Sequence, residues 1–169
     1  SQPIRLEAPG MGLAGVMTSR DLADVTAMEE AVARHRNVVV IGGGLLGLEA
    51  AYGLAKAGAN VSVVHLMDRL MERQLDARAA AMLKHEVEGR GIAVHLNAQT
   101  TPHRGRGRVE AVTLEDGRNL AADLVLVAAG IRPSVDLARA ADLDIHRGIV
   151  VDDHLQPSRP GIFAIGECA

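Results

Sequence analysis

The chain holds two apolar runs of the kind found in fully buried strands, with a helical segment between them. Asn37–Ile41 contains four consecutive β-branched residues, and Val61–His65 is a second apolar run. Strands of a parallel sheet are covered on both faces, so they are apolar throughout and do not alternate. Between the runs, small and apolar residues recur at three- and four-residue steps, which predicts a helix that lies flat on the sheet and ends at Gly58. Its predicted inner face is Gly47, Ala50, Ala51, Leu54 and Ala57.

The same periodicities predict two further helices. One covers residues 21–35, with Thr18 or Ser19 as its cap. The other begins after the capping residue Asp76 and ends at Gly89 and Gly91. The predicted inner positions are Leu22, Val25, Met28 or Glu29, and Val32 in the first helix, and Ala79, Ala80, Leu83 and Val87 in the second.

Apolar runs at 92–96 and 124–128 predict two more strands of the parallel sheet, and shorter strands are predicted at 149–151 and 162–165. Residues 109–114 alternate between apolar and polar, and Asp116-Gly117 is a hairpin signal, so residues 98–122 are predicted to form a small antiparallel β-meander. Residues 1–17 are rich in glycine and proline and are predicted to be extended or loop. The loop at 66–75 joins the second strand to the helix that follows it.

Gly42-x-Gly44-x-x-Gly47 lies between the first strand and its helix, where a dinucleotide-binding turn requires glycines. One glycine permits the tight turn, one lets backbone N–H groups approach a pyrophosphate, and one allows close packing of helix on strand. The helix N-terminus then faces the phosphates. The alternative is a glycine turn in another α/β fold without a dinucleotide. The strand, helix and returning strand at the expected spacing favour the dinucleotide site.

These elements predict an α/β protein: a Rossmann-like three-layer domain with a parallel sheet and a small antiparallel β-meander. Three parts are predicted along the 169 residues: a linker segment and lead-in helix (1–36), the dinucleotide-binding domain (37–151) and a return segment (152–169).

Composition excludes several other classes of function. A net charge of −3 and an aromatic content of 1% give no basis for nucleic-acid binding, so the basic segment at 103–108 is interpreted as a solvated hairpin tip. No apolar run approaches the roughly 18 residues of a membrane span. The single cysteine, Cys168, excludes an internal disulfide and a CxxC pair, which fits the cytoplasm. The histidines lack ligand spacing, so no metal site is predicted.

Four segments together resemble a known family: VVVIGGGLLGLEAAYGL, VVHLMDRLMERQLD, AAGIRP and GIVVDDHLQPSRPGIFAIGECA. The chain resembles the FAD-dependent pyridine nucleotide–disulfide oxidoreductase superfamily, from residue 15 to residue 169. Within it, LMERQLD and the ending GEC are most similar to the large subunit of assimilatory NAD(P)H nitrite reductases and to related electron-transfer subunits of nitrate assimilation.

The resemblance implies that the chain is the NAD(P)H-binding domain of a longer flavoprotein, and that the FAD domain of the same polypeptide is its partner. Hydride would pass from NAD(P)H to FAD, and electrons would then reach nitrite. FAD, siroheme and an iron–sulfur cluster are expected only in the intact protein, and the domain alone is expected to be inactive. No residue here is expected to be catalytic. The alternatives are a ferredoxin- or rubredoxin-type NAD(P)H reductase and a dinucleotide-sensing module without turnover.

The resemblance also assigns site residues. Gly42, Gly43, Gly44 and Gly47 form the pyrophosphate-binding turn, with the N–H groups of Leu45 and Leu46 as further donors. Glu49 resembles a family glutamate near the nicotinamide carboxamide, or else is an exposed first-turn glutamate favoured by the helix dipole. The segment Ala129, Gly130 and Ile131 resembles a strand end whose backbone passes close to the nicotinamide.

Cofactor preference stays open because of His65. Sites specific for NAD usually have Asp or Glu at the end of the second strand to accept the ribose hydroxyls, and His65 stands there instead. Asp68 is predicted to fall in the following loop. Arg69 and Arg73 either meet a 2′-phosphate or are solvated. If His65 lies at the ribose, its protonation predicts a preference for NADPH that rises as pH falls.

Overall fold

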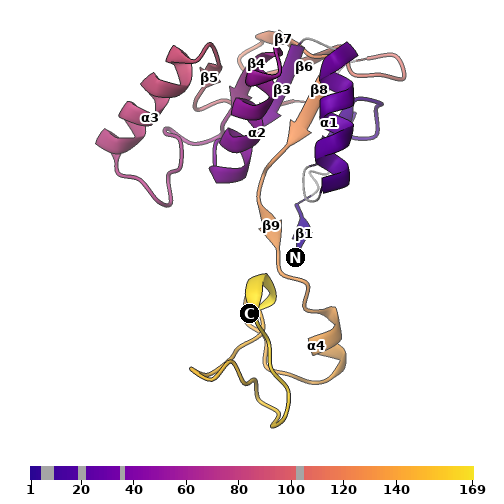
Figure 1. Ribbon diagram of the computed structural model, residues 1–169, viewed down its shortest axis with the longest axis vertical. Helices are drawn as coiled ribbons and strands as arrows, with labels where there is room; N and C mark the ends of the chain where they lie inside the picture. The colour runs from indigo at the N-terminus through magenta and orange to yellow at the C-terminus, as the bar shows by residue number, and fades with distance from the viewer. Residues whose placement is uncertain (5–9, 19–21, 35–36, 102–104) are drawn as a thin grey trace. The chain divides into compact units, whose positions relative to one another are not determined.

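The structure is a computed structural model that describes residues 1–4, 10–18, 22–34, 37–101 and 105–169. The predicted cap Ser19 and the start of the basic segment lie outside these residues. Two compact units are present: a larger one, Arg5–Gly130, and a smaller one made of Ser1–Ile4 and Ile131–Ala169 (Figure 1). The larger unit holds β2 (Val16–Thr18), α1 (Leu22–Arg34), β3 (Asn37–Ile41), α2 (Leu45–Lys56), β4 (Asn60–Val64), α3 (Ala77–Gly89), β5 (Ala93–His95), β6 (Ala111–Thr113), β7 (Asn119–Ala121) and β8 (Leu124–Val127).

A parallel sheet of five strands, in the order β2-β8-β3-β4-β5, is the centre of the larger unit. Successive residues of β3 point to opposite faces of this sheet, as a strand requires. Val38 and Val40 pack with residues of the helices, including Met28, Leu54 and Val87. Val39 and Ile41 pack on the other side with residues of the β6–β7 region.

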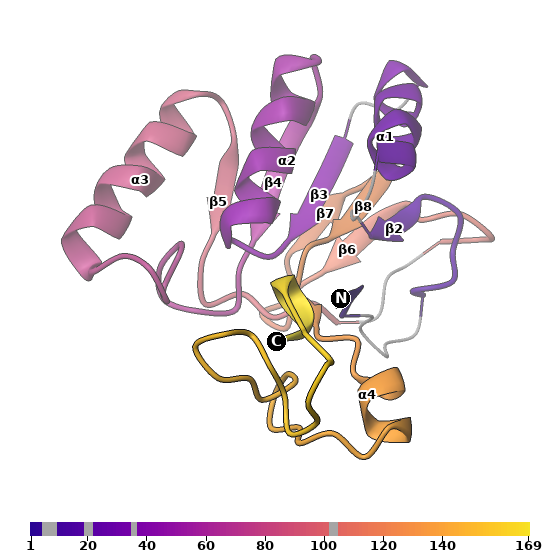
Figure 2. The ribbon, with the colours of Figure 1, turned by 60° about the horizontal axis from the view of Figure 1, so that its bottom comes forward.

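The larger unit therefore has three layers: helices, sheet and an antiparallel hairpin (Figure 2). The predicted fold class is confirmed. The predicted meander is the hairpin β6–β7, extended by an isolated bridge between Thr100 and Leu114. Asp76 caps α3 as predicted, since its side chain accepts a hydrogen bond of 2.8 Å from the N–H of Ala79.

The structure corrects the predicted inner faces at two positions. Val25 is 42% exposed, whereas Met28 and Val32 of the same helix are buried as predicted. Ala57 is exposed as well, since it is the C-cap of α2 and lies past the helical turn that contacts the sheet.

The structure also corrects three predictions about strands. Val16–Thr18 is β2 and pairs with β8, whereas the sequence predicted extended or loop structure up to residue 17 and offered Thr18 as a helix cap. Residues 149–151 form no strand; Ile149 makes only an isolated bridge with Ile145. Residues 162–165 form no strand either, and Ile165 is 69% exposed. Apolar residues alone do not make a strand, because a ladder also needs a neighbouring strand in register.

The smaller unit contains little regular structure. It holds β1 (Gln2–Pro3), β9 (Ile131–Arg132), α4 (Asp136–Ala140) and a single 3₁₀ turn (Gly166–Cys168). β1 and β9 form a short antiparallel pair. Backbone hydrogen bonds hold the long return segment, among them one of 2.7 Å from the N–H of Ile149 to the carbonyl of Cys168. The boundaries predicted between the three parts of the chain, after residue 36 and after residue 151, stay predictions.

Candidate functional site

The glycine turn joins β3 to α2, and its three signature glycines have different surroundings. Gly42 has φ +124° and donates its N–H to the carbonyl of Val64 at 2.9 Å. A Cβ on Gly42 would overlap the carbonyl of Ala128, and one on Gly47 would overlap the carbonyl of Gly42. A Cβ on Gly44 would meet nothing within 4 Å. Gly42 and Gly47 are therefore required for the turn and for close helix packing, whereas Gly44 leaves space in front of the backbone.

The N-terminus of α2 offers unpaired backbone donors at this open position. Gly44 is the N-cap and supplies no capping side chain. The N–H groups of a first helical turn have no partner within the helix, and the helix dipole adds partial positive charge. Leu45 and Leu46 are 58% and 50% exposed, and Glu49 is exposed one turn later. The residues present fit a pyrophosphate held by backbone N–H groups.

His65 follows β4 directly and is buried, with an exposed fraction of 9%. Its ring nitrogen Nδ1 accepts a hydrogen bond of 3.1 Å from the N–H of Gly43. The other ring nitrogen, Nε2, lies 3.1 Å from Oε2 of Glu72. The structure therefore brings His65 and the glycine turn together through a contact within the protein, which the sequence did not predict. A direct contact of His65 with ribose stays a prediction.

Residues of the segment that follows His65 also contact the glycine turn. Leu70 is fully buried, and the N–H of Met71 donates to the carbonyl of Gly43 at 3.0 Å. A Cβ on Gly43 would come within 2.6 Å of Leu70 Cδ2 and 2.8 Å of His65 Cγ. Sequence reasoning missed the roles of Leu70, Met71 and Glu72. The run LMER contributed to the family resemblance, but no pattern of residue types in it indicates that these residues contact Gly43 or His65.

Charged residues surround the outer part of this segment. Nη1 of Arg69 donates to both carboxylate oxygens of Asp68, each at 3.3 Å. The side chain of Arg73 is 73% exposed, with Nε 3.9 Å from Oε1 of Glu72. Partial burial by itself raises the pKa of Glu72. Hydrogen bonds from its own backbone and from His65, together with electrostatic attraction to His65 and Arg73, outweigh burial and lower that pKa below 4.5.

The predicted nicotinamide side is built by the end of β8. Ala128 donates its N–H to the carbonyl of Ile41 at 2.8 Å, which places the residues after β8 beside Gly42. Ala129 and Gly130 are exposed, and Gly130 has φ +104°. The third predicted residue, Ile131, is described with the smaller unit, where it pairs with Pro3 in the β1–β9 ladder.

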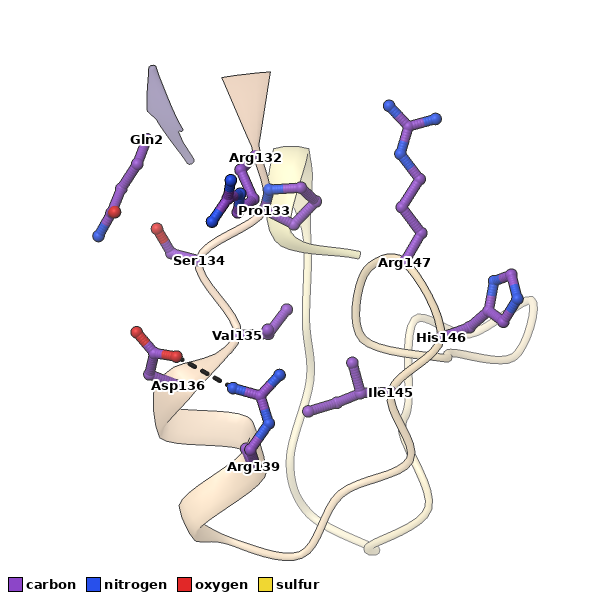
Figure 3. Close-up of a pocket in the computed structure, with 10 residues that line it drawn as sticks. All are labelled: Gln2, Arg132, Pro133, Ser134, Val135, Asp136, Arg139, Ile145, His146 and Arg147. Atoms are coloured by element: carbon purple, nitrogen blue, oxygen red, sulfur yellow. Dashed lines mark hydrogen bonds and ion pairs between the residues drawn. The ribbon is translucent and has the colours of Figure 1, made fainter. Parts of the chain in front are cut away.

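A cavity of about 300 Å³ lies elsewhere, within the smaller unit (Figure 3). Val135 and Ile145 form its apolar side, and Asp136 and Arg139 form an ion pair at 3.1 Å on its wall. The side chains of His146 and Arg147 point away from the centre of the group (Figure 3). No residue predicted for dinucleotide binding lines this cavity, so the glycine turn is the stronger candidate site.

Two further properties of the described residues limit the chemistry. Among them, no group of three His, Cys, Asp or Glu side chains could hold a metal ion. None of the helices described in the structure has both the length and the apolar character needed to cross a membrane.

Comparison with known proteins gives consistent matches across the chain. The family model described as pyridine nucleotide-disulphide oxidoreductase matches residues 1–169. Nitrite reductase [NAD(P)H] of Bacillus subtilis is 46% identical over 169 residues, which are 100% of this chain and 21% of the relative. The ferredoxin–NAD(+) reductase component of the biphenyl dioxygenase system of Paraburkholderia xenovorans is 40% identical over 165 residues, 98% of this chain and 40% of the relative.

A solved structure of a ferredoxin reductase from Rhodopseudomonas palustris superimposes with a TM-score of 0.94 and 36% identity. The match covers 99% of this chain and 42% of that one. The chain therefore spans between about a fifth and two fifths of the length of these relatives.

Proposed function

Because this chain belongs to the pyridine nucleotide-disulphide oxidoreductase family, we propose that its larger unit is the NAD(P)H-binding domain of a longer flavoprotein oxidoreductase. The observation that carries the proposal is the open position at Gly44, directly before the N-terminus of α2. A pyrophosphate there meets the N–H groups of Leu45 and Leu46 and the positive end of the helix dipole.

The residues of the chain bind and orient the dinucleotide. The bound nicotinamide supplies the hydride, and the protein supplies position and electrostatics. The exposed backbone at Ala129 and Gly130 lies at the end of β8, beside the turn, and lines the nicotinamide side. The exposed Glu49, one turn into α2, is the residue proposed to meet the nicotinamide carboxamide. Arg69 and Arg73 flank the ribose side, where an added 2′-phosphate would carry negative charge.

The whole protein is proposed to reduce nitrite to ammonia in the cytoplasm, with electrons passed from NAD(P)H through FAD to siroheme and an iron–sulfur cluster in other parts of the polypeptide. The identity of 46% with nitrite reductase [NAD(P)H] of Bacillus subtilis over the whole chain supports this assignment. The second candidate is a reductase of ferredoxin or rubredoxin. The 40% identity with the ferredoxin–NAD(+) reductase component of Paraburkholderia xenovorans supports that alternative.

Exposed apolar side chains in the smaller unit support the proposal of a partner domain within the same polypeptide. Leu155, Phe163 and Ile165 are 46%, 64% and 69% exposed, which is unusual for three large apolar side chains in one short segment. The FAD domain is the proposed partner for this apolar surface.

Titration of the full chain with NADH and NADPH tests dinucleotide binding. We expect saturable heat of binding by calorimetry, and shifts of the backbone amide signals of Gly42 to Leu46 in NMR spectra. Absence of binding by the folded chain, or shifts confined to the residues around the cavity of the smaller unit, would contradict the proposal. For the whole protein, NAD(P)H-dependent consumption of nitrite is expected, and consumption only with ferredoxin or rubredoxin as acceptor would favour the second candidate.

A further inference from the structure

The peptide groups on both sides of Gly43 are held by residues that follow β4. The N–H of Gly43 donates to Nδ1 of His65 at 3.1 Å, and its carbonyl accepts from the N–H of Met71 at 3.0 Å. Both partners lie beneath the turn, where Gly43 itself is buried. The neighbouring residue, Gly44, faces open space. The orientation of the donors at Gly44 and Leu45 therefore depends on how Gly43 is held.

The two contacts of the His65 ring determine which of its nitrogens carries the proton. A backbone N–H is only a donor, so Nδ1 must present its lone pair to Gly43. In the neutral ring the proton is then on Nε2, from which it is donated to Oε2 of Glu72 at 3.1 Å. Glu72 thus fixes the tautomer and the ring orientation, and the ring passes that orientation to Gly43.

We propose that His65 is a positioning residue for the dinucleotide turn: its neutral ring, oriented by Glu72, holds the Gly43 amide so that the following backbone N–H groups point at the pyrophosphate. The inference rests on the proposed binding of a dinucleotide by this turn. It assigns His65 a role through Gly43, which differs from a direct contact with the ribose.

A proton on Nδ1 would reverse the effect of the ring. It would place one donor against another at Gly43, while the contact with Glu72 would persist. The Gly43 amide would then lose its acceptor. Affinity for the dinucleotide should therefore be higher with the neutral ring than with the charged ring, and should fall on acidification.

Few other charged groups face the ring among the described residues. Glu72 contacts Nε2, and Arg73 lies beside the same carboxylate. From β5, His95 meets residue 65 through its backbone carbonyl, which accepts the His65 N–H at 2.8 Å. The His95 ring instead lies 3.1 Å from the guanidinium of Arg118, which also pairs with Asp116. From the glycine turn, the group that faces the His65 ring is the backbone N–H of Gly43.

Two variants separate the two contacts of the ring. His65→Asn places an amide oxygen where Nδ1 accepts from Gly43, lacks the reach to Glu72 and does not titrate. His65→Leu removes both contacts and leaves the Gly43 N–H without its acceptor. His85→Asn is the matched control, because His85 is exposed on α3.

The experiment measures the dissociation constant of oxidised NAD for the full chain between pH 5.5 and 8. This ligand lacks the 2′-phosphate, whose own ionisation near pH 6 would complicate the result. The wild-type chain and His85→Asn should lose affinity about twofold to tenfold as pH falls, the range expected for one neutral hydrogen bond. His65→Asn should bind with little dependence on pH. His65→Leu should bind about twofold to tenfold more weakly than the wild-type chain at pH 8.

A second measurement needs no ligand. Nitrogen NMR of the His65 ring at pH 8 should show a proton on Nε2 and none on Nδ1. The opposite tautomer, or the same loss of affinity at low pH in His65→Asn, would overturn the inference. A rise in NADP affinity relative to NAD at low pH that disappears in His65→Asn would also overturn it, in favour of direct contact with the ribose phosphate. Absence of NAD binding at pH 8 by the folded wild-type chain would instead overturn the proposed function, and this inference with it.

Discussion

The amide of Gly43 and the ring of His65 lie 22 positions apart in the sequence and meet at 3.1 Å beneath the glycine turn. This contact joins the segment after β3 to the segment after β4, the two strand ends at which a Rossmann-like sheet binds its ligand. The loop that begins at Leu66 is thereby part of the turn's support. Leu70 and Met71 contact Gly43, and Glu72 contacts His65. Changes in this loop should consequently affect dinucleotide binding even where they touch no ligand.

Gly44→Val should abolish measurable dinucleotide binding and leave the fold intact. The position has φ −84°, which a valine adopts, and a new Cβ meets no protein atom within 4 Å. The added side chain would occupy the space proposed for the pyrophosphate. Calorimetric titration and thermal unfolding of the variant check both parts. Unchanged affinity at an unchanged melting temperature would show that the pyrophosphate does not bind here.

Gly47→Ala should lower the free energy of unfolding by about 1–3 kcal/mol, because the new methyl group would overlap the carbonyl of Gly42 and force the turn and α2 apart. Gly53→Ala is the matched control in the same helix. Its Cβ would meet nothing within 4 Å, so that variant should gain about 0.5–1 kcal/mol from improved helix propensity. Urea unfolding measures both, and equal effects of the two substitutions would be inconsistent with this packing.

Asp123→Ala should destabilise the larger unit by about 1–3 kcal/mol, since it leaves partly buried donors without an acceptor. The carboxylate accepts from the backbone N–H of Asn37 at 3.0 Å and from its side-chain amide at 3.1 Å. Asp123→Asn keeps an acceptor oxygen and should recover much of the loss. Urea unfolding is again the measurement. Dinucleotide affinity should not change at temperatures where the variants are folded, because these contacts lie at the opposite end of β3 from the glycine turn.

Glu72→Gln should lower stability at neutral pH by roughly 0.5 kcal/mol, a value typical of partly exposed ion pairs. The folded-state pKa of Glu72 lies below its ordinary value of 4.5, so the carboxylate form is the one that the fold favours. Its stabilisation is fully present above about pH 4.5 and is lost as pH falls through the lowered pKa. The difference between wild type and variant in urea unfolding should accordingly shrink as pH falls below about 4.5. A difference that grows as pH falls below that value would contradict this account.

Arg73→Ala should weaken binding of NADPH by up to about fivefold and leave NADH binding unchanged. The Arg73 side chain is 73% exposed, and its nearest approach to Glu72 is a long 3.9 Å, so its guanidinium is available to a 2′-phosphate. Solvent screening limits the size of the effect. Arg69→Ala is the comparison, because the Arg69 guanidinium already contacts Asp68 at 3.3 Å. Dissociation constants of both dinucleotides for both variants provide the test. Equal losses for NADH and NADPH would place Arg73 away from the 2′-phosphate.

Local patterns in the sequence were sufficient to predict the strands that are buried on both faces, the helix between β3 and β4, and the position of the glycine turn. Each of these follows from a local regularity. Four β-branched residues in succession predict β3, the three-residue and four-residue steps predict α2, and glycine is the residue type that tolerates the conformation at Gly42. The family model, which matches residues 1–169, is consistent with the fold that these local patterns predict.

Pairing between residues far apart in the sequence became visible only in the folded chain. β2 is a strand because β8 offers it a ladder in register, whereas residues 162–165 are apolar but have no such neighbour among the described residues. His65 illustrates the same limit at the candidate site. Its place after β4 is readable from the sequence, but the partners of its two ring nitrogens are not, because Gly43 and Glu72 reach it from separate loops. Hydrogen bonds of this kind depend on how the chain packs, and local patterns of residue type do not record that packing.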